Sequence, residues 1–418
     1  MPPLAGSEKN LFAAGPPPVT HTATARFPTM SAFDSELDQL RARSLFRRLR
    51  EFDSPAGTEV SLGGKRLLNF ASNDYLGFAA DPVLREAAKA AIDKYGVGSG
   101  ASRLICGTLS PHARLEEALA DFKRTEAALT FSSGYAAAVG TLGALCGRDD
   151  VIILDKLAHA SLIDGAKLSG AVLRIFPHNH LGKLESHLRW ARENYPDARI
   201  LVVTESVFSM DGDWCPLAEI VALKNRFGAL LLLDEAHALG VIGDHGRGLA
   251  DHLGLAGKVD IHLGTLSKAL GCSGGTICGT RALIDLLINR ARAFIYSTAP
   301  PPALAATARA AIELLLSPTG EMRRQRLRQN LAQFAEGMPQ LFDAERKIQS
   351  AIIPVMLGPA DAALEAARRL ADAGCFVPAI RYPTVPKDAA RLRVTLSARH
   401  LPDQISALCK AVAHVVST

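Results

Sequence analysis

The sequence predicts an α/β fold whose large domain is built around a mainly parallel sheet. Five apolar runs of strand length lie at 127–131, 151–154, 200–204, 230–233 and 261–263. The run at 230–233 contains no polar residue, which is typical of a strand covered on both faces in a parallel sheet. Helical stretches separate most of the runs, and this alternation is typical of consecutive β–α units.

The N-terminal part of the chain predicts an extension, a helix and a hairpin. Residues 1–29 are rich in Pro, Ala, Thr and Gly and predict a disordered extension, so Met30 is an alternative start to the first methionine. Residues 30–74 predict a helix at 34–50, with leucines near helical spacing, and a hairpin at 58–70 around two adjacent glycines.

The remaining sequence predicts two domains. Residues 75–300 contain the apolar runs and predict the large domain, which begins with a helix at 82–94. A run of three prolines interrupts the pattern, and a helix-rich segment follows it. Strands and helices then alternate to the end of the chain, so we expect a smaller C-terminal α/β domain over 301–418.

Composition excludes several classes of protein. The chain has 418 residues, 48% of them hydrophobic, and a net charge of +5 from basic residues that are spread out, which disfavours a nucleic-acid surface. Seven cysteines without a C-x-x-C pair predict neither a disulfide framework nor a metal site. No apolar run approaches the roughly 20 residues of a membrane helix, and the chain has no signal-peptide pattern. We therefore expect a cytoplasmic protein.

Two short blocks carry the strongest indication of chemistry. Asp234 and His237 follow the apolar run at 230–233, at the strand end where open α/β sheets bind ligands. Lys268 lies in a polar turn between small residues. An acid, a histidine and a sheltered lysine suit pyridoxal phosphate (PLP), because the lysine forms the Schiff base and the acid keeps the pyridine nitrogen protonated. The alternative is an acid that caps a helix and a lysine on the surface.

The magnitude of the electrostatic interaction supports the role of the acid. Two opposite charges about 4 Å apart attract by roughly 4 kcal/mol at an effective dielectric constant near 20. This energy corresponds to about three pKa units, which is enough to keep a pyridinium protonated at neutral pH.

A strand-to-helix turn predicts a binding site for the cofactor phosphate. Gly134 and Tyr135 follow two serines at the point where the strand at 127–131 gives way to a helix. Small residues at a helix N-terminus let backbone N–H groups approach an anion. Thr265 and Ser267 add hydroxyl donors beside the lysine. An ordinary turn before a helix is the alternative.

Other polar residues follow the neighbouring strands. His159 comes just after the run at 151–154 and is a candidate for stacking on the cofactor ring, or else a structural histidine. Glu205 and Ser209 follow the run at 200–204. A glycine-rich segment at 96–103 resembles a dinucleotide fingerprint, but it follows a predicted helix rather than a strand, so we reject a dinucleotide site.

Two arginines on a late strand are candidates for binding a carboxylate. Arg391 and Arg393 are two residues apart and therefore lie on the same side of a strand. Arginine binds carboxylates through two parallel hydrogen bonds. A solvated strand face is the alternative.

In combination these motifs resemble the α-oxoamine synthases, fold-type I PLP enzymes that join an amino acid to an acyl thioester with loss of carbon dioxide. The resemblance covers about residues 34–415 and is carried by segments 73–77, 98–103, 159–161, 208–212, 234–237 and 267–268. The sequence departs from the family where His237 is followed by Ala238 rather than glycine. The resemblance implies a homodimer with an active site shared between subunits.

The resemblance also implies substrates. Segments 294–301 and 380–397 are similar to the branch that condenses L-alanine with a pimeloyl thioester of coenzyme A or acyl carrier protein in biotin biosynthesis. Glycine C-acetyltransferase, 5-aminolevulinate synthase and serine palmitoyltransferase share the chemistry and remain alternatives, as does a PLP aminotransferase. A PLP-binding regulator would need a DNA-binding module, and we find none in the sequence.

The family pattern assigns roles to individual residues. The catalytic residues it implies are Lys268, His159, Asp234 and His237. The other residues implied to contact the cofactor are Gly134, Tyr135, Ser209, Thr265 and Thr298, the last of them across the dimer. The residues implied to hold the substrate are Arg47, Asn73 and Arg393.

Overall fold

The computed structural model describes residues 31–342 and 348–416, and the chain divides into two compact units, 1–48 and 49–418. The predicted disordered extension and the alternative start at Met30 lie outside the described residues. The domain boundaries derived from the sequence stay a prediction.

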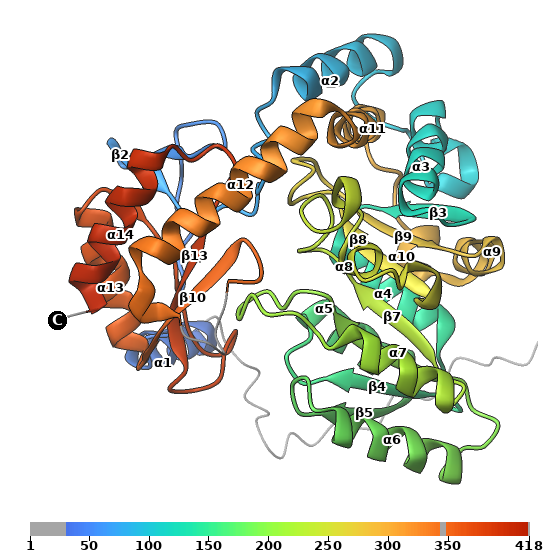
Figure 1. The fold of residues 1–418 in the computed structure, drawn as a ribbon. Coiled ribbons are helices and arrows are strands. Elements are labelled where there is room, and N and C mark those ends of the chain that lie inside the picture. The colour runs from blue at the N-terminus through green and yellow to red at the C-terminus, as the bar shows by residue number, and fades with distance from the viewer. Residues whose placement is uncertain (1–30, 343–347, 417–418) are drawn as a thin grey trace, which may run out of the picture. The chain divides into compact units, whose positions relative to one another are not determined.

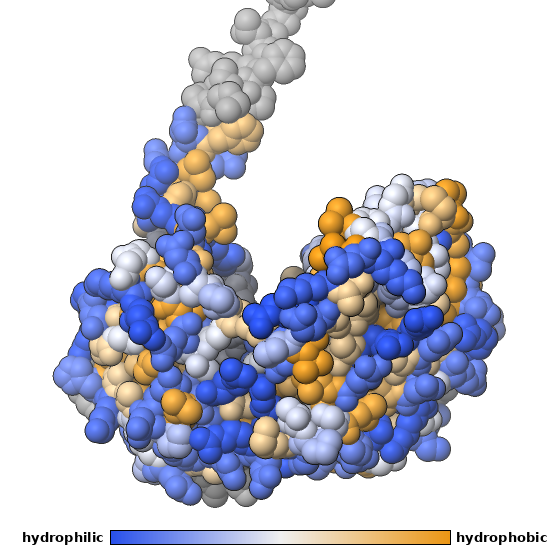
Figure 2. Space-filling model, turned by 90° about the horizontal axis from the view of Figure 1, so that it is seen from above, coloured by the Kyte–Doolittle hydropathy of each residue, from blue (hydrophilic) through white to orange (hydrophobic). Residues whose placement is uncertain are grey.

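The first unit contains helix α1 (Ser31–Ala42). The prediction of a helix reaching residue 50 is wrong, because the backbone turns at Ser44, where φ is +54°, a left-handed value that does not continue an α-helix. Phe33, Leu37 and Leu40 are 58%, 36% and 38% exposed. Figure 2 shows apolar and polar sides on this helix, next to the grey residues.

The second unit is organised around a seven-stranded sheet with the order β3-β9-β8-β7-β6-β4-β5 (Figure 1). The strands are β3 (Ala127–Phe131), β4 (Val151–Asp155), β5 (Val172–Phe176), β6 (Ile200–Glu205), β7 (Leu230–Asp234), β8 (Ile261–Thr265) and β9 (Gly275–Gly279). Strands β5, β4, β6, β7 and β8 run parallel, and β9 is antiparallel to both β3 and β8. The predicted mainly parallel sheet is therefore confirmed.

All five apolar runs are strands of this sheet, but the sequence did not indicate β5 and β9. Strand β5 lies at the edge of the sheet and has the sequence Val-Leu-Arg-Ile-Phe, of which only Phe176 is buried and which an arginine interrupts. Strand β9 begins and ends with glycine. Gly275 has no room for a side chain, because an added Cβ would lie 2.4 Å from the Ser133 carbonyl oxygen.

Helices cover both faces of the sheet, and the strand alternation explains why. On β7, Leu231 and Leu233 belong to one core with helices α6 and α7, whereas Leu232 belongs to a second core with α4, α5 and α9. These helices are α4 (Gly134–Leu145), α5 (Ala160–Ser169), α6 (Leu181–Asn194), α7 (Leu217–Arg226) and α9 (Arg281–Arg290). Helices α2 (Pro82–Tyr95), α3 (Ser110–Lys123), α8 (Leu249–His252), α10 (Arg292–Ile295) and α11 (Pro302–Leu316) complete this part. The helix predicted at 82–94 is confirmed as α2.

Two small sheets lie beyond the long helix α12 (Pro318–Gly337), as Figure 1 shows. One has the order β10-β13-β12 and is antiparallel, with strands β10 (Ile352–Gly358), β12 (Ala379–Ile380) and β13 (Ala390–Thr395). The other joins the predicted hairpin, β1 (Glu59–Leu62) and β2 (Lys65–Asn69), to β11 (Cys375–Phe376). Helices α13 (Ala360–Asp372) and α14 (Pro402–Val416) complete this part.

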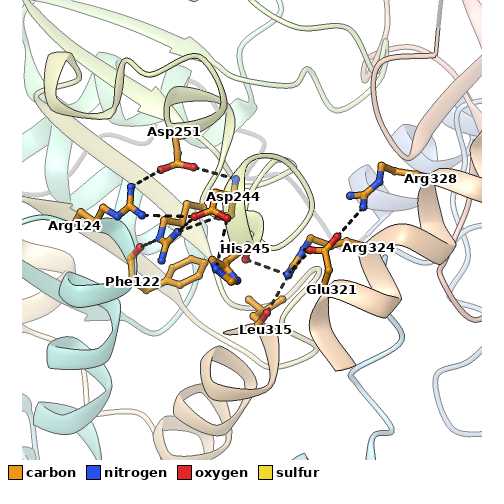
Figure 3. A network of polar contacts seen from close by, with 10 residues as sticks. Phe122, Arg124, Asp244, His245, Asp251, Leu315, Glu321, Arg324 and Arg328 are labelled. Carbon is orange, nitrogen blue, oxygen red and sulfur yellow. Dashed lines mark hydrogen bonds and ion pairs between the residues drawn. The ribbon is translucent and has the colours of Figure 1, made fainter. Parts of the chain in front are cut away.

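A polar network around the buried Arg324 fixes the start of α12 (Figure 3). The Arg324 side chain is 1% exposed and donates to the carbonyl oxygens of His245 and Leu315 at 3.1 Å each. Arg124, at the end of α3, reaches Asp244 in the same loop at 3.6 Å. Because a buried guanidinium needs its acceptors, Arg324 holds the α11–α12 junction against the loop that follows β7.

Among the described residues, no helix is both long and apolar enough to cross a bilayer.

Candidate active site

Two carboxylates meet at the carboxyl edge of the parallel sheet. Asp234 and Glu205 end the neighbouring strands β7 and β6 and are paired in register. Both are buried, and Asp234 accepts a hydrogen bond from the Ala236 backbone at 2.9 Å. Burial raises the pKa of Asp234 to about 6, although the Lys268 charge opposes the rise. Burial and the Asp234 charge also raise the pKa of Glu205.

Lys268 is brought to these carboxylates by the turn that follows β8. Its Nζ atom lies 2.9 Å from Nε2 of His237. Burial lowers the pKa of Lys268 to about 8, while the charges of Asp234 and Glu205 oppose this change. A lysine with this pKa is partly neutral near pH 7 to 8, the state in which its amine is a nucleophile and a base.

His237 links the lysine to a second group of residues. Its Nδ1 atom lies 2.5 Å from the Tyr75 hydroxyl, which lies 3.3 Å from the side-chain oxygen of Asn73. Arg393 donates from Nη1 to the same Asn73 oxygen at 3.1 Å. Burial, with the charges of Lys268 and Arg393, lowers the pKa of His237 well below its usual value, so this imidazole is neutral.

Arg391 and Arg393 both reach the loop after β6, but only one of them has a carboxylate partner there. Arg393 donates from Nε to the Ser209 carbonyl oxygen at 2.7 Å. Arg391 pairs with Asp211 at 2.5 Å. Arg391 is thus committed to a structural ion pair, and Arg393 is the arginine that remains for a substrate carboxylate.

His159 caps α5 beside the same sheet edge. Its Nδ1 atom lies 2.7 Å from the Ser161 hydroxyl, and its backbone N–H donates to Glu205 at 2.5 Å. Burial and the Lys268 charge lower its pKa, which favours a neutral ring. A neutral imidazole held from both its ring and its backbone has the fixed orientation that stacking on a planar cofactor requires.

The N-terminus of α4 lies against the turn that carries Lys268. The Ser133 side chain caps the helix by accepting from the Ala136 backbone at 3.1 Å. A Cβ on Gly134 would lie 3.4 Å from the Thr265 hydroxyl oxygen, and that oxygen lies 2.8 Å from the Ser267 hydroxyl. Backbone N–H groups and two hydroxyls therefore converge at the positive end of a helix.

Comparison with known proteins decides the family. Residues 65–412 match the family model of class I and II aminotransferases. An 8-amino-7-oxononanoate synthase of Geotalea daltonii is 45% identical over 92% of this chain and 98% of its own. Another from Anaeromyxobacter dehalogenans is 48% identical over 91% and 94% of the two chains. The chain belongs to the 8-amino-7-oxononanoate synthase family of class I and II aminotransferases.

Solved structures agree with this family. The serine palmitoyltransferase of Sphingomonas wittichii has a TM-score of 0.87 at 32% identity, over 94% of this chain and 98% of its own. An 8-amino-7-oxononanoate synthase of Francisella tularensis has a TM-score of 0.71 at 31% identity, over 84% and 98% of the two chains. Membership in the 8-amino-7-oxononanoate synthase family confirms three predictions for this chain: the fold-type I architecture, the acyltransferase class and PLP as the cofactor.

The residues present fit that cofactor. A buried amine with a lowered pKa lies at Lys268, a buried acid lies at Asp234, and a helix N-terminus with two hydroxyls lies at Gly134. These are the three features that an aldehyde, a pyridine nitrogen and a phosphate require. The individual roles assigned to site residues stay predictions.

Two predicted site residues contribute little to this cluster, and a third belongs to the other compact unit of the chain. Arg47 belongs to the N-terminal unit. Thr298 is exposed and forms a β-bridge with Ser102. The Tyr135 hydroxyl donates to Asp164 at 2.8 Å, and its ring is half exposed.

One residue of the cluster was not predicted. Tyr75 is 1% exposed and contacts His237, from which 162 residues separate it. An aromatic residue in a turn is more often part of a core, so the sequence carried no signal that singled it out.

Proposed function

We propose that this chain condenses L-alanine with a pimeloyl thioester and releases carbon dioxide and 8-amino-7-oxononanoate, a step of biotin biosynthesis. The observation that carries the proposal is the connection between Lys268 and Arg393 through His237, Tyr75 and Asn73. It links an amine suited to proton transfer with a cation suited to an amino-acid carboxylate. The names of the relatives support L-alanine and the pimeloyl group as the substrates.

Arg393 and Asn73 orient the amino acid. The guanidinium offers hydrogen bonds to the carboxylate, and the Asn73 side chain contributes its amide. Ser209 holds Arg393 from the other side through its carbonyl oxygen. An arginine fixed at two points loses little further freedom on binding, which favours one substrate orientation.

Lys268 moves the proton. With its pKa near 8, the amine takes a proton from the amino acid's Cα and returns one at the end of the reaction. Bound PLP supplies an electron sink for the charge that develops at this carbon. Asp234 is the residue that would pair with its ring nitrogen, and His237 the one that would contact its ring hydroxyl.

A homodimer with a shared site belongs to the proposal. Several apolar side chains near Thr298 are well exposed in the single chain: Leu104 is 50%, Ile105 78% and Tyr296 72% exposed. An exposed apolar group of this kind is typical of an interface. In that dimer Thr298 would reach the cofactor phosphate of the partner, and Arg47 would join the substrate site.

The cytoplasmic location expected from the sequence remains a prediction.

The test is to identify the product. PLP-loaded protein is incubated with L-alanine and either pimeloyl-CoA or pimeloyl-acyl carrier protein, and mass spectrometry detects 8-amino-7-oxononanoate. Lys268→Ala should abolish the product, whereas Lys167→Ala, at an exposed lysine of α5, should not change it. Absence of the product with both carriers would overturn the proposal.

Serine palmitoyltransferase activity is the second candidate, because the Sphingomonas wittichii structure has a TM-score of 0.87 against 0.71 for the Francisella tularensis one. The same assay with L-serine and palmitoyl-CoA tests it. Glycine with acetyl-CoA or succinyl-CoA tests the other acyl transfers, and amino exchange with α-ketoglutarate tests an aminotransferase.

A further inference from the structure

Tyr75 is a buried residue of the site, with Asn73, His237 and Arg393 as polar neighbours of its hydroxyl. Its side chain is 1% exposed, and the turn that carries it is held by backbone hydrogen bonds from Tyr75 to Asn73 at 2.9 Å and from Ala398 to Tyr75 at 2.7 Å. A buried hydroxyl needs a hydrogen-bond partner. Here the two candidates are the Asn73 side-chain oxygen and Nδ1 of His237.

The surroundings of the Tyr75 hydroxyl favour His237 over Asn73 as the acceptor of its proton. The hydroxyl carries one proton, and Nδ1 of His237 is 2.5 Å away whereas the Asn73 oxygen is 3.3 Å away. The Asn73 oxygen already accepts from Arg393 at 3.1 Å. The shorter bond is the stronger one, and the Asn73 oxygen already has a donor, which favours donation of the hydroxyl proton to Nδ1 of His237.

Donation to Nδ1 determines where the imidazole proton lies. A neutral imidazole has one N–H group and one acceptor nitrogen. Burial and neighbouring positive charges keep His237 neutral. With Nδ1 as acceptor, the proton is on Nε2, which faces the Lys268 Nζ atom 2.9 Å away.

We propose that Tyr75 is a positioning residue that fixes the Nε2–H tautomer of His237 and thereby favours the neutral amine of Lys268. An Nε2–H group can donate a hydrogen bond to the lone pair of a neutral amine. An ammonium has no lone pair and cannot accept that hydrogen bond. The inference deepens the proposed function and rests on it, because it concerns the reactivity of the same lysine.

Other charged and titratable groups face Lys268, and they do not depend on the tautomer. Asp234 and Glu205 favour its charged form, whereas Arg393 disfavours it. His159 also lies within electrostatic reach of Lys268. Removing the Tyr75 hydroxyl keeps all four charges but takes a hydrogen-bond partner from Arg393. An effect through Arg393 would persist when His237 is absent, so a His237→Ala background separates it from an effect through His237.

The test follows capture of PLP by the apo protein as a function of pH. Samples are reduced with borohydride, and mass spectrometry quantifies the modified Lys268 peptide. Tyr75→Phe keeps the ring but lets His237 present a bare Nε2 to an ammonium. We expect the midpoint of the capture rate to move up by about one pH unit.

Two comparisons make the test specific. Tyr195→Phe removes a hydroxyl from a tyrosine that packs on Trp190, and it should leave the midpoint unchanged. In a His237→Ala background, Tyr75→Phe should produce no further shift, because the effect passes through His237. Thermal unfolding of each variant identifies any loss of folding.

The outcomes are distinguishable. No capture by the unsubstituted protein would overturn the proposed function. Normal capture with an unchanged midpoint in Tyr75→Phe would overturn this inference alone, as would the same shift in the His237→Ala background. A second measurement, ¹⁵N NMR of the apo protein with His237 assigned by substitution, should show Nδ1 as the unprotonated nitrogen; a protonated Nδ1 contradicts the inference.

Discussion

Arg393 donates a hydrogen bond to the Asn73 side chain at 3.1 Å, although 320 residues separate the two. Arg393 lies on β13 of a small sheet, and Asn73 lies in the turn that follows the hairpin strand β2. A backbone hydrogen bond also joins these two distant segments: the Thr395 N–H donates to the Phe70 carbonyl oxygen at 2.9 Å. Backbone pairing between the two segments is therefore what places the arginine.

This contact predicts that Arg393→Lys loses affinity for L-alanine specifically. Lysine keeps the charge but lacks the planar fork that binds a carboxylate through two hydrogen bonds and reaches Ser209 and Asn73 at once. We expect the KM for L-alanine to rise about tenfold or more, with a smaller change for the acyl thioester. Steady-state kinetics with each substrate varied in turn measures this. Arg290→Lys, at an exposed position of α9, is the matched control and should behave like the unsubstituted protein.

The fold was predictable where burial leaves a simple pattern. Residues 127–131 on the edge strand β3 and residues 231–233 on the central strand β7 are buried, so their apolar runs identified strands directly. Strand β5 at the edge and β9 with its terminal glycines lack such runs. The helix was predicted to reach residue 50 but ends at Ala42. The prediction failed because leucine spacing does not reveal the left-handed backbone conformation at Ser44.

The site was predictable where chemistry follows a strand end. Asp234 comes directly after one apolar run and Lys268 lies in the turn after another, so their positions at one sheet edge could be inferred. The contact of Tyr75 with His237 could not be inferred, because it depends on how the turn before α2 packs against the sheet. Likewise, the spacing of the two arginines did not distinguish Arg393 from Arg391. The family resemblance selected Arg393, and the ion pair of Arg391 with Asp211 supplies a physical reason for that choice.

Asp234→Asn should separate cofactor binding from cofactor activation. The substitution keeps the shape but removes the charge, so the ring nitrogen of bound PLP loses its anionic partner. An interaction of about three pKa units predicts a loss of about a thousandfold in exchange of the L-alanine Cα proton. Proton NMR in D₂O at saturating PLP measures this exchange. Asp93→Asn, on the exposed side of α2, is the control, and ordinary exchange in Asp234→Asn would contradict the assigned role.

A buried ion pair next to Asp234 predicts a dependence of stability on acid. Lys123 lies 2.6 Å from Glu235, and His262 lies 3.0 Å from the same carboxylate oxygen. Burial alone would raise the pKa of Glu235, but Lys123 and His262 outweigh it and lower the pKa to about 2. The folded pKa is below the unfolded value, so this stabilisation is complete above pH 4.5 and is lost as the pH falls toward 2, by roughly 3 kcal/mol.

Urea unfolding at several pH values tests this pair. Lys123→Met removes the cationic partner of the buried Glu235 carboxylate and leaves only His262 beside it, so it should lower the free energy of unfolding by about 3 kcal/mol at neutral pH. The double variant Lys123→Met with Glu235→Leu should recover most of that loss and should depend less on pH below 4.5. An equally steep pH dependence in the double variant would show that other carboxylates dominate.

His178 predicts the opposite dependence on pH. Its ring lies 3.1 Å from Asp155 and 2.8 Å from Asp213, in the loop that also carries Ser209. Burial would lower its pKa, but hydrogen bonds to both carboxylates outweigh it and raise the pKa to about 10. Because the folded pKa exceeds the unfolded value of 6.5, this stabilisation is present below pH 6.5 and declines as the pH rises toward 10.

His178→Gln should therefore lower Tm at pH 6.5, and its Tm should approach that of the unsubstituted protein by pH 10. Thermal unfolding across this pH range measures the difference. The control is the same substitution at His187 on α6, which is partly buried and contacts the Ile175 carbonyl oxygen rather than a carboxylate. A Tm difference that stays constant with pH would contradict the charged state assigned to His178.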